Sequence, residues 1–324
     1  MRKKLGTFFT GTALAAAFVF LTCTLLVLVS PVEFMTIGVL ILAPITAGVI
    51  TLSFATEDQV LSVKYKIFAP WGGIIIWSAI ALVYEYETLI CVLLIAPLYA
   101  VLSSIGGLFA GWVRTNFCNR TFNGTSACVV LLPYLVLPIE GNIGTQTRYV
   151  QTSSSISIHA PKESVWQGII EVPNITEDEL IWTFSHQIGI PKPVSACVSA
   201  IEVGGVREIV WRRGLRFFET ITNVEHYERL QYEVSVDPDA EPIKALDTHV
   251  VLGDRYFDVT HGSYSLDQND STTTLTLMSQ YRLSTKINFY AEFWANIVFD
   301  DFHRSVLTVI KKRVEAGASK SCTH

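Results

Sequence analysis

A few histidines, carboxylates and arginines in the second half of the sequence could do acid–base chemistry. His261 lies in the strand-like run Asp258-Val259-Thr260-His261-Gly262, three residues before Tyr264. Histidine is the commonest general base because its pKa lies near neutrality. We keep His261 and Tyr264 as catalytic candidates, although the sequence alone favours a half-exposed His261. The other polar candidates are His249, Asp254, Asp258, Arg212 and Arg216.

The sequence contains no recognisable cofactor or metal motif. Asp300 and His303 lie three residues apart on a predicted helix, so they share a face and could hydrogen-bond or bind a metal. Two ligands fall short of the usual three or four, so we interpret them as a surface pair. The GxSxG, HExxH, P-loop and paired dinucleotide-binding glycine patterns do not occur. We predict no metal and no cofactor, and the sequence names no reaction.

Six cysteines are scattered along the chain without CxxC or CxxH spacing. This pattern predicts neither a zinc site nor a disulfide framework, and it leaves the redox compartment open. The six are Cys23, Cys91, Cys118, Cys128, Cys197 and Cys322.

Large aromatic side chains in the second half could form the wall of a small-molecule pocket, because they combine apolar surface with hydroxyl or indole groups. Any single one is more often ordinary core. Three on the last helix, Tyr290, Trp294 and Ile297, are the stronger candidates. The predicted ligand-binding residues are Trp182, Trp211, Tyr232, Tyr264, Tyr281, Tyr290, Phe293, Trp294 and Ile297.

The composition predicts that the first half of the chain lies in a membrane and the second half in water. Half of the residues are hydrophobic, and the mean hydropathy of +0.39 is too high for an ordinary soluble protein. Residues 1–139 carry 12 of the 53 charged side chains, and the later residues carry the other 41, with a net charge of −7. An acidic soluble half argues against nucleic acid as a partner.

Long uncharged runs predict four membrane-spanning helices at about 6–30, 34–56, 67–84 and 88–113. Each is near the roughly 20 residues that cross about 30 Å of hydrocarbon. Small residues on the fourth predict close helix packing: Gly106, Gly107, Ala110 and Gly111. The runs contain no ionisable side chain, which argues against a pump or an ion channel.

The basic residues of the first half predict the orientation of these helices. All seven lie before the first helix, between the second and third, or after the fourth. Because Lys and Arg are retained on the cytoplasmic side, the N-terminus is expected in the cytoplasm, in a protein of the cytoplasmic (inner) membrane.

A shorter apolar run, Ala127 to Ile139, determines the side of the second half. A fifth span over about 125–141 would place that half outside the cytoplasm. The alternative is an interfacial or re-entrant segment, favoured by Pro133 and Pro138, which would leave it in the cytoplasm. The length that Ser126 and Gly141 allow favours the fifth span.

The second half alternates like strands and ends in one long amphipathic helix. A strand ending at Ala160-Pro161 precedes a short helix, and Thr176 with Glu179 has the spacing of a capping box for a helix over about 177–186. Six strand-like segments follow, separated by turn residues, at 194–203, 206–212, 216–224, 229–236, 257–266 and 272–283. The closing helix is predicted over 288–316.

Residues Tyr149 to Glu315 resemble the SRPBCC superfamily, the helix-grip fold of START-like lipid transfer domains and polyketide cyclases. The resemblance is carried by Ile156 to Trp166, similar to the opening strand and helix of that family, and by the closing strand and helix. The whole chain looks like its membrane-anchored bacterial members. We therefore expect an all-α transmembrane domain (1–143) and an α+β helix-grip domain (144–324), an antiparallel curved sheet round a long helix.

The resemblance implies an apolar cavity between the sheet and the helix. The first hypothesis is a membrane protein that binds or transfers a hydrophobic, lipid-like ligand, with the bilayer as its other partner. The second is a membrane-bound cyclase-type enzyme that uses the same cavity. The third is a non-catalytic interaction or regulatory module. Fold alone does not choose between them.

Overall fold

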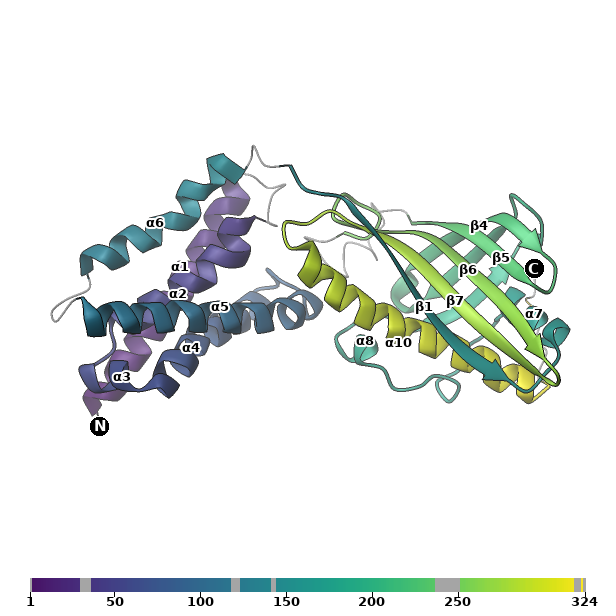
Figure 1. The fold of residues 1–324 in the computed structure, drawn as a ribbon, viewed down its shortest axis with the longest axis horizontal. Coiled ribbons are helices and arrows are strands. Elements are labelled where there is room, and N and C mark those ends of the chain that lie inside the picture. The colour runs from purple at the N-terminus through teal and green to yellow at the C-terminus, as the bar shows by residue number, and fades with distance from the viewer. Residues whose placement is uncertain are drawn as a thin grey trace. The chain divides into compact units, whose positions relative to one another are not determined.

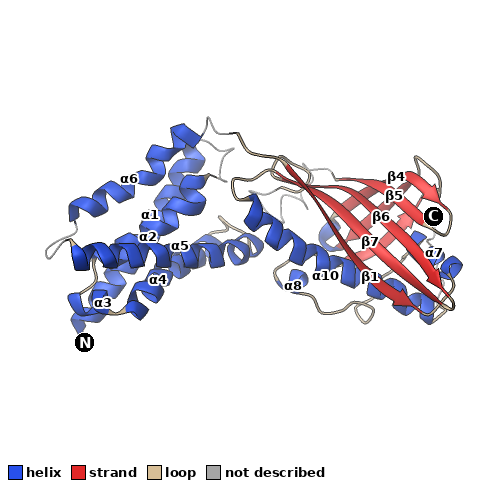
Figure 2. Cartoon of the chain, viewed as in Figure 1, coloured by secondary structure: helices blue, strands red, loops and turns tan. Residues whose placement is uncertain are grey.

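The computed structural model describes residues 2–29, 36–117, 123–140, 144–236, 251–317 and 322. The chain forms two units, Met1–Thr145 and Gln146–His324. The first is helical, and the second combines a sheet with helices (Figure 1, Figure 2). The division falls two residues after the boundary expected from the sequence.

The first unit contains several apolar helices. Among the described residues, the segments Lys4–Leu25, Val63–Val83 and Leu89–Asn116 are long and apolar enough to cross a membrane. Two apolar helices, Gly38–Ser53 and Val129–Glu140, are shorter. The helices are α1 (Arg2–Val29), the π-helical turn η1 (Gly38–Leu42), α2 (Ala43–Ser53), α3 (Glu57–Leu61), α4 (Val63–Val83), α5 (Leu89–Asn116) and α6 (Asn123–Glu140).

The second predicted span, 34–56, is shorter in the structure than the sequence suggests. Its helix runs from Gly38 to Ser53, and residues 34 and 35 lie outside the described part. The helix cannot continue through Thr56, because Thr56 caps the next helix: its backbone N–H donates to Gln59 Oε1 at 2.8 Å. The predicted small-residue face of α5 is buried. A Cβ added at Gly106 would lie 1.9 Å from the carbonyl oxygen of Ile45, so α2 and α5 pack backbone to backbone.

The second unit is a seven-stranded antiparallel sheet with three helices among its described residues. The strand order is β1-β7-β6-β5-β4-β3-β2. The elements are β1 (Arg148–Ile158), α7 (Lys162–Ile170), α8 (Phe184–Gln187), β2 (Pro193–Val198), β3 (Val206–Trp211), β4 (Arg216–Glu225), β5 (Arg229–Ser235), β6 (Phe257–Asn269), β7 (Thr272–Leu283) and α10 (Asn288–Glu315). The long helix α10 runs beneath the curved sheet (Figure 1). This is the helix-grip arrangement expected from the sequence.

Antiparallel pairing gathers the strand termini at two ends of the sheet. Arg148 at the start of β1 pairs with Leu283 at the end of β7, and Leu283 pairs with Phe257 at the start of β6. We call this the tether end, because the second unit begins here at Gln146 and α10 begins here at Asn288. The opposite far end holds the β2–β3 and β6–β7 turns.

The core is closed at the far end. Here α7, β7 and the second half of α10 bury their apolar faces against one another in one cluster. The alternating burial of β7 follows from its alternating sequence, since every second side chain points at α10. The fully buried members include Trp166, Ile169, Leu275, Leu277, Leu307 and Ile310.

The helix predicted over 177–186 is wrong. Residues 177–179 form a turn, and only Phe184–Gln187 is helical. One of the two capping-box hydrogen bonds does form: Thr176 N donates to Glu179 Oε2 at 2.8 Å, and Thr176 Oγ1 donates to the same oxygen at 2.9 Å. The same carboxylate is bound by Arg313 of α10, whose Nε donates to Glu179 Oε1 at 2.6 Å. This long-range ion pair holds the segment against α10 as a turn.

A disulfide joins Cys197 of β2 to Cys322, 125 residues later. The spacing of the cysteines in the sequence gave no sign of this disulfide. The pairing depends on the fold, because the chain after α10 returns to the edge strand β2, where the backbone N–H of Cys322 donates to Glu171 Oε2 at 3.1 Å. Cys23 and Cys91 lie outside this disulfide; Cys118 is outside the described residues, and Cys128 lies in α6, where its side chain is not described.

Candidate functional site

The concave face of the sheet carries a buried ion pair. Arg207 Nη1 of β3 lies 2.8 Å from Glu219 Oε2 of β4, and the two side chains are 3% and 7% exposed. Burial raises the pKa of the Glu219 carboxyl, and the charge of Arg207 opposes this rise. The Arg207 guanidinium carbon lies 5.6 Å from the centre of the Tyr264 ring, and the Tyr264 and Tyr232 rings are 6.0 Å apart. Charge and aromatic surface therefore meet inside the grip.

Gly262 on β6 makes room for this cluster. A Cβ at position 262 would lie 2.4 Å from Cε2 of Tyr232, so any larger residue would displace the ring. The Arg207 Nε atom is buried and has no hydrogen-bond partner among the described residues. An unpaired buried donor is costly, so this N–H is available to an acceptor.

A second polar group, His303, connects α10 to the sheet. His303 is fully buried; its Nε2 lies 2.8 Å from Ser279 Oγ of β7, and its Nδ1 lies 3.2 Å from Ser154 Oγ of β1. Ser154 Oγ donates its proton to Asp300 Oδ1 at 3.4 Å. Ser154 must therefore accept from His303, so the Nδ1 atom carries the proton of the imidazole. Burial lowers the pKa of His303 to about 4. The Asp300–His303 pair is thus no surface pair, because only Asp300 is exposed.

At the tether end, a few buried rings are surrounded by apolar side chains that are only partly buried. Trp211 and Phe302 stack with ring centres 5.6 Å apart, and Tyr281 stacks on Phe299 at 4.8 Å. Around these buried rings lies a set of partly exposed apolar residues that we call the tether-end rim. Its members are Val150, Ile190, Ile209, Phe217, Val236, Val251, Leu252, Phe257 and Val259.

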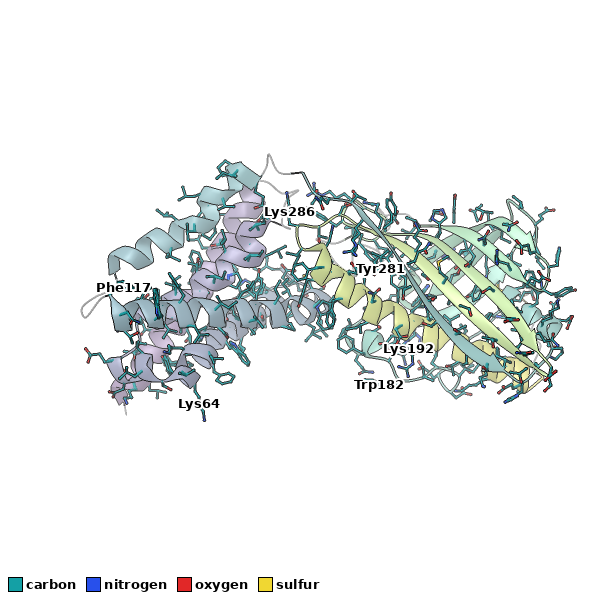
Figure 3. The ribbon with its side chains drawn as sticks, in the orientation of Figure 1. Lys64, Phe117, Trp182, Lys192, Tyr281 and Lys286 are labelled. Carbon is teal, nitrogen blue, oxygen red and sulfur yellow. A yellow bond between two sulfur atoms is a disulfide. The ribbon has the colours of Figure 1, made fainter. Side chains whose placement is uncertain are left out.

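The predicted ligand-binding residues divide into three groups. Trp211, Tyr232, Tyr264 and Tyr281 are buried, and Tyr281 donates its hydroxyl to Asn296 Oδ1 at 2.7 Å. Tyr290, Trp294 and Ile297, on the first half of α10, are half-buried. Trp182 is 74% exposed on the loop before α8 (Figure 3), and Phe293 is 56% exposed.

The two catalytic candidates point in opposite directions. Tyr264 is buried in the interior, whereas the His261 side chain is 48% exposed and lies 3.7 Å from Glu233. His261 and Tyr264 are three residues apart on β6, so strand alternation places them on opposite faces of the sheet. Arg212 and Arg216 are exposed and form ion pairs with Glu177 and Glu208. His249 lies outside the described residues.

Sequence reasoning missed Arg207, Glu219 and the partners of His303. One signal was present in the alternation of two strands. Arg207 shares a strand face with Ile209 and Trp211, and Glu219 shares one with Ile221. Each charged residue therefore occupies a position where strand alternation predicts an apolar, inward-facing side chain. The serine partners Ser154 and Ser279 gave no such signal.

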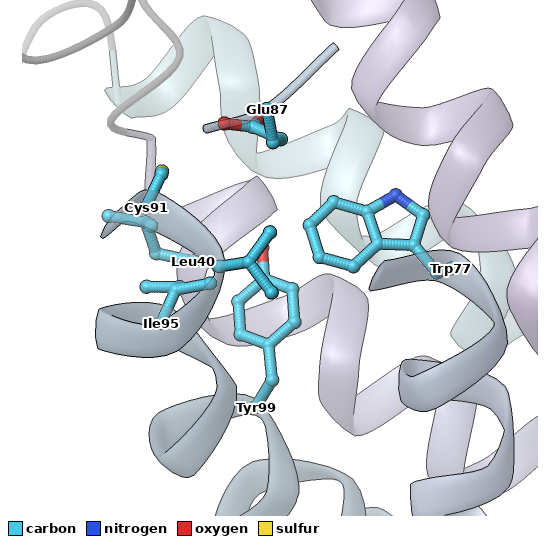
Figure 4. A pocket seen from close by; sticks show the side chains of 7 residues that line it. Leu40, Trp77, Glu87, Cys91, Ile95 and Tyr99 are labelled. Carbon is cyan, nitrogen blue, oxygen red and sulfur yellow. The ribbon is translucent and has the colours of Figure 1, made fainter. Parts of the chain in front are cut away.

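A separate small cavity lies among the helices of the first unit (Figure 4). The Tyr99 hydroxyl beside it donates to the carbonyl of Val39 at 3.0 Å. Its volume of about 20 Å³ has room for about one water molecule, so it cannot hold a lipid-like ligand. It is lined by Leu40, Trp77, Glu87, Cys91, Val92, Ile95 and Tyr99.

Comparison with known proteins gives similarities in fold alone. No family model matches the sequence, and no curated protein matches it. Among solved structures, DynU16 from the dynemicin biosynthetic locus is 15% identical over 52% of this chain and 48% of its own, with a TM-score of 0.30. A protein from Nitrosospira multiformis is 19% identical over 53% of this chain and all of its own, with a TM-score of 0.30.

Norcoclaurine synthase from Thalictrum flavum, solved as a point mutant with a transition-state analogue, is also similar to this chain. It is 9% identical over 55% of this chain and all of its own, with a TM-score of 0.33. The helix-grip fold implied by the SRPBCC resemblance is shown in this chain by its strand order and closing helix.

The buried His303 makes the stability of this domain depend on pH. Above about pH 6.5 the imidazole is neutral in both the folded and unfolded states; between about pH 6.5 and 4 only the unfolded state binds a proton. We expect the free energy of unfolding to fall by roughly 3 kcal/mol across this window, and we expect this loss to be complete at about pH 4. The measurement is urea unfolding of the detergent-solubilised chain, followed by the circular dichroism of the sheet.

The control is His303→Gln, which keeps hydrogen-bonding capacity but cannot titrate. The free energy of unfolding of this variant should not show this fall between about pH 6.5 and 4, whatever the stability of the variant at pH 7. An equal decline in both proteins would show that His303 does not cause it.

Proposed function

We propose that this protein binds an apolar, lipid-like ligand in its helix-grip domain and holds that domain beside a membrane through its N-terminal helices. The observation that carries the proposal is the contrast along the grip. The far-end cluster consists mostly of buried side chains, whereas at the tether end a few buried rings are surrounded by a larger number of aromatic and aliphatic side chains that are only partly buried. Exposed apolar surface of this kind favours an apolar occupant.

A membrane anchor suits such a ligand. Three helices of the first unit are long and apolar enough to cross a bilayer. Lipid-like molecules dissolve poorly in water, because each exposed methylene costs about 0.8 kcal/mol. A binding domain tethered at the bilayer shortens the aqueous path. The outward position of His261 favours binding over a cyclase reaction that uses it as the base.

Two adjacent phenylalanines on β4 allow a matched test of the binding site. Phe217 belongs to the tether-end rim, whereas its neighbour Phe218 lies on the opposite face of the strand and is exposed. In the full chain in nanodiscs, we expect Phe217→Lys to reduce photo-crosslinking of a diazirine fatty acid to the second unit at least about fivefold, because a charge in the apolar site opposes binding. Phe218→Lys should leave the yield within about twofold.

The site is wrong if both variants crosslink like the unmodified protein. The chain could instead fold and show no crosslinking that excess unlabelled fatty acid competes away. That result would favour the interaction-module hypothesis.

We also propose that the helix-grip domain lies outside the cytoplasm. The Cys197–Cys322 disulfide supports this side, because disulfides persist mainly in oxidising compartments. The basic residues of the first half favour a cytoplasmic N-terminus. Counting both shorter apolar helices, five apolar helices precede the domain, and an odd number of passages leads to the opposite side.

Reporter fusions after His324 test the side of this domain. We expect a reporter that is active only outside the cytoplasm to work, and one that is active only in the cytoplasm to be silent. In intact cells, Cys322→Ser should expose Cys197 to an impermeant maleimide without added reductant. An active cytoplasmic reporter, or Cys197 that reacts equally in the unmodified chain, would contradict this topology.

A further inference from the structure

The start of the helix-grip domain is fixed to the start of α10. Asn288 Nδ2, at the first residue of α10, donates to the carbonyl of Gln146 at 2.7 Å. Arg148 Nη1 lies 2.9 Å from Glu292 Oε2, one turn further along α10. The entry of the chain therefore cannot move away from the N-terminal turns of α10 without breaking both interactions.

The covalent chain limits how far this end can lie from the membrane helix before it. Glu140 ends α6, and six residue steps separate it from Gln146. Fully extended, six steps span at most about 20 Å. If α6 lies in the bilayer as proposed, the first turns of α10 must stay close to the bilayer surface.

The same turns of α10 present large apolar side chains to solvent. Phe289 is 70% exposed and Phe293 is 56% exposed. They lie four residues apart, so they share one face of the helix. Burying one phenylalanine side chain is worth about 1.5–3 kcal/mol, and phenylalanine is among the residues that helices lying on a membrane bury at the boundary between headgroups and acyl chains.

We propose that Phe289 and Phe293 insert into the headgroup layer of the bilayer and dock the tether end of the domain on the membrane surface. Glu292, which lies between the two phenylalanines in sequence, is paired with Arg148. Docking through two aromatic rings is weak by itself. Because the tether keeps the domain beside the bilayer, a modest free energy of insertion is sufficient to keep it docked.

This docking rests on the proposed function and adds a route for the ligand. The half-buried Trp294 and Ile297 lie next to these phenylalanines on the same half of α10, and Trp294 stacks on Phe184 of α8. The tether-end rim and the docked face are thus built on one stretch of helix. A ligand leaving the bilayer would meet the open end of the grip first.

A fluorophore at position 289 tests the docking in the full chain. The four cysteines outside the disulfide are replaced by serine, Phe289→Cys is labelled, and the protein is placed in phosphatidylcholine vesicles with or without a lipid that carries a nitroxide on its headgroup. The control is Val203→Cys, because Val203 is 68% exposed but lies in the β2–β3 turn at the far end. The 11 residues of β1 separate the two ends by about 36 Å.

We expect nitroxide lipid to quench the label at 289 at least about twofold and to leave the label at 203 nearly unchanged. Adding Phe293→Asp should reduce quenching at 289, because a carboxylate opposes insertion. The proposal is overturned if both labels are quenched equally. It is also overturned if Phe293→Asp leaves quenching at 289 unchanged, since the tether alone would then account for the proximity.

The control for folding is the sheet circular dichroism of each labelled protein. Should the substitution at 289 disturb it, a label at Phe293→Cys with Phe289→Asp as the second change provides the same comparison. Fatty-acid crosslinking of the same proteins separates the two proposals. Quenching without crosslinking would retain the docking and reject the ligand, whereas crosslinking without quenching would do the reverse.

Discussion

The helix-grip domain depends on the packing of α10 along the concave face of the sheet. This contact buries the inward side chains of β1 and β7 and brings α7 and α8 against the helix. His303 fixes its middle, because one imidazole bonds serines on both strands. Beyond His303 the helix side chains Leu307, Val309 and Ile310 are fully buried, whereas Tyr290, Trp294 and Ile297 before it are only half-buried. The helix thus divides the domain into a closed half and an open half.

Polar interactions in the interior determine positions more than they add stability. The Arg207–Glu219 pair gains Coulomb energy but loses hydration, so a buried pair is weak evidence for stability. Its effect is to align β3 with β4 beneath the tyrosine rings. Arg313 acts similarly at the far end, where Glu179 has its pKa lowered to about 2, chiefly by the hydrogen bond from Arg313. Arg207 joins neighbouring strands, whereas Arg313 joins segments distant in sequence, and each makes one arrangement preferable.

Local patterns predicted most of the secondary structure, because alternation and helical periodicity reflect nearby residues. The strands β3 to β7 and the long α10 follow the sequence closely. The errors occur where a distant partner decides. Arg313 holds residues 177–179 as a turn, and Cys197 meets Cys322 only because the chain returns to β2. The bulge between Val259 and His261 on β6 was likewise not visible in the alternation. The sequence also could not tell which of the aromatic side chains are buried in the core.

The central claim is that the open half of the grip holds an apolar molecule. The most direct measurement is native mass spectrometry of the full chain released from detergent, with lipid extraction and identification of any molecule that remains bound. The account predicts a stoichiometric lipid-like adduct that survives removal of the detergent and dissociates when the domain unfolds. A chain that is folded, intact in its disulfide and free of any such adduct after incubation with a lipid extract would contradict it.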